Sequence, residues 1–362
     1  RLRTSKAKGN LPMTGKYMAY VGSYSYTGKA KGITVYDVDV EAGKFIYRCE
    51  VEVDNSSYLK SSQNGKILYS IADEGVVAFR VLPNGSLARL NSAKIKGMRG
   101  CHLSTSKADD YIFISGFHDG KITVLHLNED GSVGDIADGV FHKGLGSVAE
   151  RSFRPHVSCS RLTPDERFLM VADLGIDQIK VYRFDHKDGK IALVDTIRCE
   201  LESAPKYFMF SSDGRFFYVL YEMKNVIEVY SYKEGERVPI VEKIQTISST
   251  GSKPNQLTAA CAMHFSPGEK HVFCSNAGDN TVSMYDRDDE TGMLTLRFCL
   301  PISGDYPKDI AIFPGGEHLA SINHEGSISF FKIDYEKGLL VMSDRSIKVN
   351  EPNCCEIVKI GD

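Results

Sequence analysis

The chain has no tryptophan, little net charge and no long hydrophobic run. Its 362 residues carry 44 basic and 47 acidic side chains, a net charge of −3, so charge gives no case for nucleic acid binding. No segment approaches the roughly 20 apolar residues that span a bilayer, so we expect no membrane insertion. Without tryptophan the Trp-Asp dipeptide of WD40 repeats is missing, and the paired glycines of kelch repeats are missing too. These absences argue against a general protein-interaction repeat.

The nine cysteines are odd in number and lie mostly within apolar, alternating segments. This arrangement favours reduced core thiols over a disulfide framework, and predicts a cytoplasmic protein. The first residues, Arg1–Pro12, are basic and polar without an apolar core, so we expect no signal peptide there. We interpret residues 1–16 as a flexible extension and 17–362 as one domain.

A short acidic or polar turn that ends in glycine recurs seven times, each time after an alternating apolar segment. The turns are Glu41–Gly43, Pro83–Gly85, Glu129–Gly131, Lys187–Gly189, Lys233–Gly235, Glu290–Gly292 and Glu336–Gly338. Their glycines are separated by 42, 46, 58, 46, 57 and 46 residues, by subtraction of their numbers. A repeat of this size indicates one supersecondary unit copied around an axis or along a solenoid.

Each repeat also holds a second turn upstream, rich in Pro, Asp, Asn and Gly, which is followed by an apolar strand. Copies occur at Gln63–Ser70, Lys107–Ser115, Pro164–Val171, Ser212–Val219, Pro267–Cys274 and Pro314–Ser321. With the strands on either side, each repeat contains four antiparallel strands and no helical period. Four-stranded repeats of this length predict an all-β fold, a β-propeller with seven blades.

The first repeat is incomplete, because it begins at Tyr17–Ser23 with its second strand. The chain ends with Asn353–Ile360, which resembles an isolated first strand. We therefore predict that the C-terminal strand completes the N-terminal blade and removes the open edges of the ring. A β-solenoid or two sandwiches are the alternatives, and neither explains the split first repeat.

The starts of the innermost strands and the ends of the second strands indicate where chemistry lies. The candidate ligand-binding residues there are His102, His156, Lys206, Tyr207 and Lys308 on the inner strands, and Asp173, Glu222, Asn276 and Asn323 at the ends of second strands. Two long connections, 137–154 and 245–257, are expected to add cover. Lysines with nearby histidines and carboxylates suit an anionic, oxygen-rich small molecule.

A metal site built from His102, His156 and Asp173 is an alternative, but no short ligand spacing supports it. We expect no metal and no cofactor.

Four segments together resemble the seven-bladed β-propeller lactonase family: Gly22–Asp39, Asn55–Ile71, Arg154–Asp185 and Ala204–Glu222. That family includes a bacterial 6-phosphogluconolactonase and the fungal 3-carboxy-cis,cis-muconate lactonizing enzyme. The resemblance runs from about Tyr17 to the C-terminus, and its most specific part is Pro155–Tyr182. It implies that His156 and Glu222 form the proton-transfer pair, and that Lys206 joins them in catalysis.

The chain departs from the family pattern at several positions. Ser158 stands where a second histidine is common, and Ala204–Tyr207 reads APKY where the family often has GPRH. A lysine there keeps the charge but lacks the planar fork of arginine. Ala277 replaces an expected arginine, Lys308 follows Pro307 in place of another, and Ser115–Phe117 replaces Ala-Asn-Tyr.

Two functions remain open on this sequence. The first is an enzyme, a carboxylic ester hydrolase that acts on a sugar-acid lactone such as 6-phosphogluconolactone, or a muconate cycloisomerase-like enzyme that forms one. The second is a catalytically silent propeller that binds a small organic acid or a protein partner. Retention of His156, Glu222 and Lys206 favours the first, and Ala277 favours the second. We expect a monomer or weak dimer.

Overall fold

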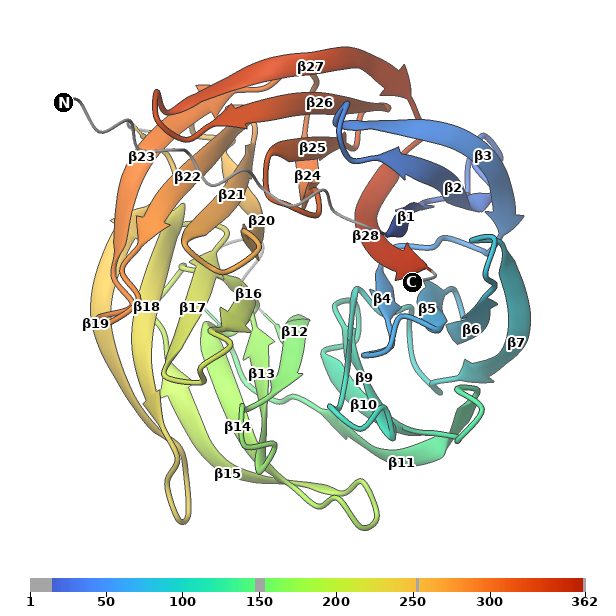
Figure 1. The fold of residues 1–362 in the computed structure, drawn as a ribbon. Helices are drawn as coiled ribbons and strands as arrows, with labels where there is room; N and C mark the ends of the chain where they lie inside the picture. The colour runs from blue at the N-terminus through green and yellow to red at the C-terminus, as the bar shows by residue number, and fades with distance from the viewer. Residues whose placement is uncertain (1–14, 147–153, 252–253, 361–362) are drawn as a thin grey trace, which may run out of the picture.

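The computed structural model describes residues 15–146, 154–251 and 254–360, and these residues contain strands and no helix. The strands form seven antiparallel sheets of four strands each, arranged as blades in a ring around a central channel (Figure 1). The prediction of a seven-bladed, all-β propeller is confirmed. No described helix is long and apolar enough to cross a membrane. The proposed extension falls almost wholly on residues 1–14, outside the described residues.

From the channel outwards, the first four blades contain the following strands. Blade 1 has β28 (Pro352–Ile360), β1 (Lys16–Ser23), β2 (Gly32–Asp39) and β3 (Lys44–Glu52); blade 2 has β4 (Leu59–Ser61), β5 (Ile67–Ala72), β6 (Gly75–Val81) and β7 (Leu87–Lys94). Blade 3 has β8 (His102–Thr105), β9 (Tyr111–Gly116), β10 (Lys121–Leu127) and β11 (Val133–Phe141); blade 4 has β12 (Val157–Leu162), β13 (Phe168–Asp173), β14 (Gln178–Phe184) and β15 (Ile191–Arg198).

The remaining three blades follow the same plan. Blade 5 has β16 (Pro205–Phe210), β17 (Phe216–Tyr221), β18 (Val226–Lys233) and β19 (Ile240–Ser248); blade 6 has β20 (Ala259–Phe265), β21 (His271–Ala277), β22 (Thr281–Arg287) and β23 (Leu294–Pro301). Blade 7 has β24 (Pro307–Ile312), β25 (His318–Asn323), β26 (Ser327–Asp334) and β27 (Leu339–Lys348). Strands β11 and β19 are longer than expected, so the connections that follow them begin later than the predicted 137 and 245.

The ring is closed by the C-terminal strand, as predicted. Strand β28 is the innermost strand of blade 1 and pairs antiparallel with β1, from Lys16 opposite Ile360 to Gly22 opposite Cys354. In Figure 1 the red β28 lies beside the blue β1 and β2. This pairing satisfies backbone groups that an open ring would leave exposed at two edges.

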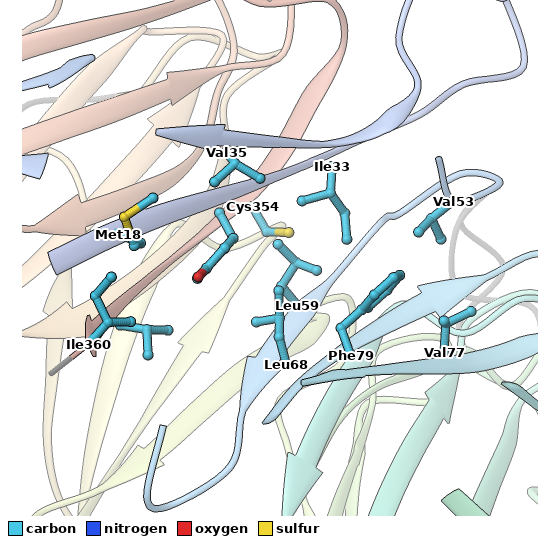
Figure 2. Close-up of a cluster of buried hydrophobic side chains, with 12 residues drawn as sticks. Met18, Ile33, Val35, Val53, Leu59, Leu68, Val77, Phe79, Cys354 and Ile360 are labelled. Atoms are coloured by element: carbon cyan, nitrogen blue, oxygen red, sulfur yellow. The ribbon is translucent and has the colours of Figure 1, made fainter. Parts of the chain in front are cut away.

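Seven clusters of buried apolar side chains lie between the blades, one at each interface. Figure 2 shows the cluster between blades 1 and 2, where Met18 and Ile33 of blade 1 pack with Leu68 and Phe79 of blade 2. Cys354 of β28 lies in the same cluster, so the closing strand also contributes to the core. Each fully buried side chain of this size contributes about 1.5–3 kcal/mol.

The recurring glycine turn has a structural reason at these interfaces. The Tyr20 hydroxyl of blade 1 donates a hydrogen bond of 2.9 Å to the carbonyl of Gly85 in blade 2. The same contact joins Tyr69 to Gly131 at 3.0 Å and Tyr218 to Gly292 at 2.8 Å. Gly85 has a φ of +86°, and a Cβ there would lie 2.6 Å from the Met18 side chain. At these three interfaces the glycine turn docks a blade against the one before it, which gives the turn a structural reason to recur.

We expect Gly85→Ala to destabilise the protein more than Gly28→Ala. Both glycines have positive φ, but a Cβ at Gly28 (φ +74°) meets no atom within 4 Å. Gly28→Ala should therefore cost only the backbone penalty, about 1–2 kcal/mol. Gly85→Ala adds a clash with Met18 and should cost roughly 1–3 kcal/mol more. Chemical denaturation of both variants measures the difference, and equal losses would show that the turn does not dock the blades.

Deletion of residues 353–362 should remove most of β28 and expose two strand edges. We expect insoluble protein or a large fall in melting temperature, because blade 1 loses its innermost strand and its part of the apolar cluster. Thermal melting of the truncated and complete chains measures the effect. A truncated chain that melts within a degree or two of the complete one would contradict closure by β28.

Candidate functional site

The channel is lined by the seven innermost strands, β4, β8, β12, β16, β20, β24 and β28. We call the opening where these strands begin the front mouth, and the opening where they end the rear mouth. A turn follows each inner strand of blades 2 to 7, and the first residue of the turn donates a backbone hydrogen bond to the next strand, as Ser211 N does to Phe216 O and Thr163 N to Phe168 O. We call this first residue the turn residue. Residues that lie the same number of positions before the turn residue of their own blade lie at the same depth in the channel, and we call each such set a layer.

Lys206 and Glu222 form an ion pair at the front mouth. Pro205 is paired with Tyr221, so the next residue on β16 and the residue that follows β17 lie at the same end of blade 5. The Lys206 Nζ lies 2.6 Å from Glu222 Oε2. Burial opposes the charge of Lys206, but the neighbouring Cys261 and Glu222 outweigh it and hold its pKa above the usual range. Lys206 is therefore a permanent cation at neutral pH.

Lys308 occupies the equivalent position in blade 7. Its Nζ donates a hydrogen bond of 2.6 Å to Asn353 Oδ1 of β28 and lies 4.9 Å from the centre of the Tyr24 ring. Burial and the nearby positive charge of Lys206 lower the pKa of Lys308 to about 8. The two lysines thus face a common space with different charge behaviour, since Lys308 loses its proton at mildly alkaline pH.

Loops from other blades complete this mouth with groups that the sequence did not single out. The Arg99 guanidinium stacks 5.0 Å from the centre of the Tyr24 ring and pairs with Asp73 at 2.9 Å. His324 contacts the same tyrosine edge-on, with ring centres 5.8 Å apart. Arg99 and His324 lie in loops next to the inner strands, and this position was the sign of them in the sequence. Neither residue belongs to a recurring motif.

His156 lies nearer the front face than the two lysines. It is seven residues before the turn residue Thr163, whereas Lys206 is five residues before Ser211. The residue equivalent to Lys206 in blade 4 is therefore Ser158, and the shared Pro-X pattern does not mark the same layer. The reason is where each strand begins: Pro205 is the first residue of β16, whereas Pro155 lies two residues before Val157, the first residue of β12. The register irregularity falls at equivalent positions of the two strands, between Val157 and Cys159 and between Pro205 and Tyr207.

The surroundings of His156 fix its tautomer. Its Nδ1 lies 2.7 Å from the carbonyl oxygen of Phe117, and its ring stacks on the Phe117 ring at 4.3 Å. Because a carbonyl only accepts, Nδ1 carries the proton and Nε2 is the basic nitrogen of the neutral ring. This is the arrangement that a general base requires.

Asp173, Asn276 and Asn323 are fully buried at the ends of their strands. Asp173 accepts from the backbone N of His156 at 2.8 Å and pairs with His142 Nδ1 at 2.7 Å. The amide groups of Asn276 and Asn323 donate to the carbonyls of Ser249 and Ser303. These side chains hold the loops of the front mouth, and direct substrate binding by them stays a prediction that requires those loops to open.

His102 and Tyr207 lie one layer deeper, in the middle of the channel. His102 is 2% exposed, and its ring centre is 4.8 Å from that of Tyr58 and 5.9 Å from that of Tyr207. Burial, reinforced by the charges of Arg161 and Lys60, holds the pKa of His102 well below its usual range. The structure therefore separates these two residues from the lysines, and substrate binding by them is untested.

The described residues contain no group of three or more His, Cys, Asp or Glu side chains that could hold a metal ion. The side chains of the set considered above have separate partners. The His102 ring packs on Tyr58, His156 Nδ1 bonds to the Phe117 carbonyl, and Asp173 pairs with His142.

The chain matches the family model described as lactonase, 7-bladed beta-propeller, over residues 18–357. It is 27% identical over 350 residues to a 6-phosphogluconolactonase of Bacillus subtilis, with 95% of this chain and 99% of the relative covered. A protein of the same name from Formosa agariphila is 26% identical, with 91% of this chain and 96% of the relative covered.

Solved structures give the same picture. A putative 6-phosphogluconolactonase of Bacteroides fragilis has a TM-score of 0.87 at 29% identity, covering 97% of this chain and 100% of the other. The periplasmic gluconolactonase PpgL of Pseudomonas aeruginosa has a TM-score of 0.89 at 23% identity, with 96% and 100% covered, which shows a common fold. With the blade count, the closure and the family match in agreement, the chain belongs to the seven-bladed β-propeller lactonase family.

Proposed function

We propose that the protein hydrolyses an anionic sugar-acid lactone at the front mouth of the channel, with 6-phosphogluconolactone as the leading candidate. The observation that carries the proposal is that Lys308 and Arg99 both lie over the Tyr24 ring, while Lys206, paired with Glu222, lies close enough to Lys308 to affect its pKa. The family resemblance adds His156 to this group. Membership in the lactonase family, with relatives named 6-phosphogluconolactonase, supports a lactone hydrolase. The phosphate group supplies the negative charge that two lysines and an arginine would attract.

The chemistry follows from the side chains present. His156 Nε2 accepts a proton from water, and the water oxygen bonds to the lactone carbonyl carbon. Lys206 stabilises the oxyanion that forms, while Glu222 keeps that lysine charged and in place. The ring C–O bond then breaks, and the imidazolium returns the proton to the departing ring oxygen. The product is the open hydroxy acid, with the phosphate near Lys308.

A catalytically silent propeller that binds a small organic acid is the second candidate. Ala277, where the family has an arginine, is fully buried and brings no charge to the front mouth. A muconate cycloisomerase-like reaction is the other enzymatic alternative: a carboxylate oxygen of the substrate would bond to one carbon of a C=C bond, and a proton donor of the site would protonate the other. A cytoplasmic location remains a prediction, supported by nine cysteines that are all free thiols.

Replacement of His156 by Ala and of Glu222 by Gln should each lower kcat by about 10²–10⁴, the range for loss of a general acid or base or its partner. Melting temperatures of both variants are measured alongside, because Glu222 is buried and its replacement leaves Lys206 without its carboxylate partner. The assay is hydrolysis of 6-phosphogluconolactone, corrected for spontaneous hydrolysis.

Asp344→Asn is the matched control for this series, since Asp344 forms an ion pair with Lys44 between the outermost strands of blades 7 and 1. Its activity should equal that of the unmodified chain. Full activity in His156→Ala and Glu222→Gln would show that the family roles do not transfer. A folded, unmodified chain without turnover would support the silent propeller.

Binding of the product 6-phosphogluconate should weaken as pH rises through about 8. Lys308 has a lowered pKa of about 8, so it is charged below that pH and neutral above it, whereas the raised pKa of Lys206 keeps that charge throughout. The phosphate is a dianion across this range, since its second pKa is about 6. Calorimetric titration from neutral to alkaline pH measures the trend.

Lys308→Arg provides the control for this pH dependence, because arginine keeps its charge. Its affinity for 6-phosphogluconate should stay nearly constant over the same pH range. An unchanged alkaline loss of affinity in Lys308→Arg would assign the titration to another group and remove Lys308 from the site.

A further inference from the structure

A cavity of about 510 Å³ opens at the rear mouth, on the face opposite the proposed lactonase site. Its walls come from the ends of inner strands β8, β12, β16 and β20 and the turns that follow them. Leu162, Met209, Phe210 and Phe265 form the apolar part of the wall, and its ionisable groups are Arg161, Lys107, Glu166 and His264. Lys107 Nζ donates to the carbonyl oxygen of Pro164, and Glu166 accepts from the backbone N of Lys107. The cavity therefore combines an apolar part with a guanidinium anchor, Arg161, as small-molecule sites do.

Arg161 lacks a carboxylate partner. Its Nε donates to the carbonyl oxygen of Phe208 at 2.9 Å, its Nη2 donates to the Tyr207 hydroxyl, and its guanidinium carbon lies 5.0 Å from the centre of the Tyr207 ring. Within the described part of the chain, no acidic side chain forms an ion pair with it. These contacts fix the plane of the guanidinium and leave further N–H donors for a ligand.

The carboxylates of the neighbouring inner strands are already engaged. Asp309 pairs with His264 at 2.8 Å and accepts from the backbone N of Cys355 at 2.9 Å. Glu356 accepts from Lys60 at 3.4 Å and from the backbone N of Ser61 at 3.0 Å. A sheltered cation without a counter-charge is unfavourable, so the cavity has an electrostatic need for one anion.

The aromatic layer in the middle of the channel makes this cavity distinct from the front mouth. Tyr58, His102 and Tyr207 lie against one another there, and His102 is almost completely buried. Tyr207 contributes to the rear cavity, whereas its neighbour Lys206 faces the front. A ligand in the rear cavity would thus not occupy the space of the lactone.

We propose that the rear cavity is a second ligand site that binds a small organic monocarboxylate with an apolar body, its carboxylate on Arg161. A planar carboxylate matches the fork of a guanidinium, and the apolar wall suits a ring or short alkyl body. A phosphate dianion fits less well, because its second charge would meet the acidic Glu166, which also lines the wall. This assignment does not depend on lactonase activity.

The test is a titration of the complete protein with 4-fluorobenzoate, followed by fluorine NMR of the ligand, with neutral 4-fluorobenzamide as the matched probe. We expect the acid to bind and the amide to bind at least roughly tenfold more weakly, since it lacks the charge-assisted bonds to Arg161. Arg161→Met should weaken binding of the acid to the level of the amide. Lys206→Met, at the front mouth, should leave it unchanged, and 6-phosphogluconate should not displace it.

Arg161→Lys keeps the proposal testable if Arg161→Met does not fold, as judged by its melting temperature. It retains a cation but loses the planar fork, so we expect an intermediate affinity for 4-fluorobenzoate. Three results would overturn the proposal: no binding of the acid at millimolar concentration, equal binding of acid and amide, or displacement of the acid by 6-phosphogluconate. Full affinity in a folded Arg161 variant would overturn it as well.

Discussion

The pairing of β28 with β1 is the constraint on which the rest of this molecule depends. It joins the two ends of the described chain across blade 1 and converts a row of sheets into a ring. Once the ring is closed, every blade packs on two neighbours through a buried apolar cluster. Closure also fixes the innermost strand of every blade around the axis of the ring, so that polar side chains of these strands gather around one channel.

The channel uses this rigid frame to keep three chemically different layers apart. The front mouth contains the Lys206–Glu222 pair and Lys308, the middle layer contains the aromatic contacts of His102 and Tyr207 together with Asp309, and the rear layer contains Arg161 and His264, which pairs with Asp309. The two lysines have unlike pKa values, because Cys261 and Glu222 raise the pKa of Lys206, whereas burial and the charge of Lys206 lower that of Lys308. The front mouth therefore holds one fixed and one titrating cation.

The sequence predicted the architecture well because its signals are local. Alternating strands, glycine turns and the split first repeat each record a backbone requirement, and the contact of Tyr20 with Gly85 shows why the turn recurs. The site was harder, because layers depend on register. Strand β12 begins two residues after Pro155, whereas β16 begins at Pro205 itself, so His156 lies two positions before the layer of Lys206 although both follow a proline.

Counting residues back from each turn would have placed His156 in its own layer and would have shown a group of ionisable side chains near the rear mouth. Arg161, Lys60 and His264 each lie two residues before their turn residues, Thr163, Ser62 and Ser266. A charged or ionisable side chain at the same position of several blades can be recognised in the sequence. Such a count does not show which side chains form ion pairs, such as Asp309 with His264, because the pairs depend on contacts between blades.

The central claim is that an anionic sugar acid binds at the front mouth between Lys206 and Lys308. A crystal structure of the protein with 6-phosphogluconate tests it most directly. The account predicts the phosphate or carboxylate within hydrogen-bond distance of both Nζ atoms, with His156 Nε2 facing the carboxyl carbon. Density for the ligand at the rear mouth alone, or against another surface, would contradict it.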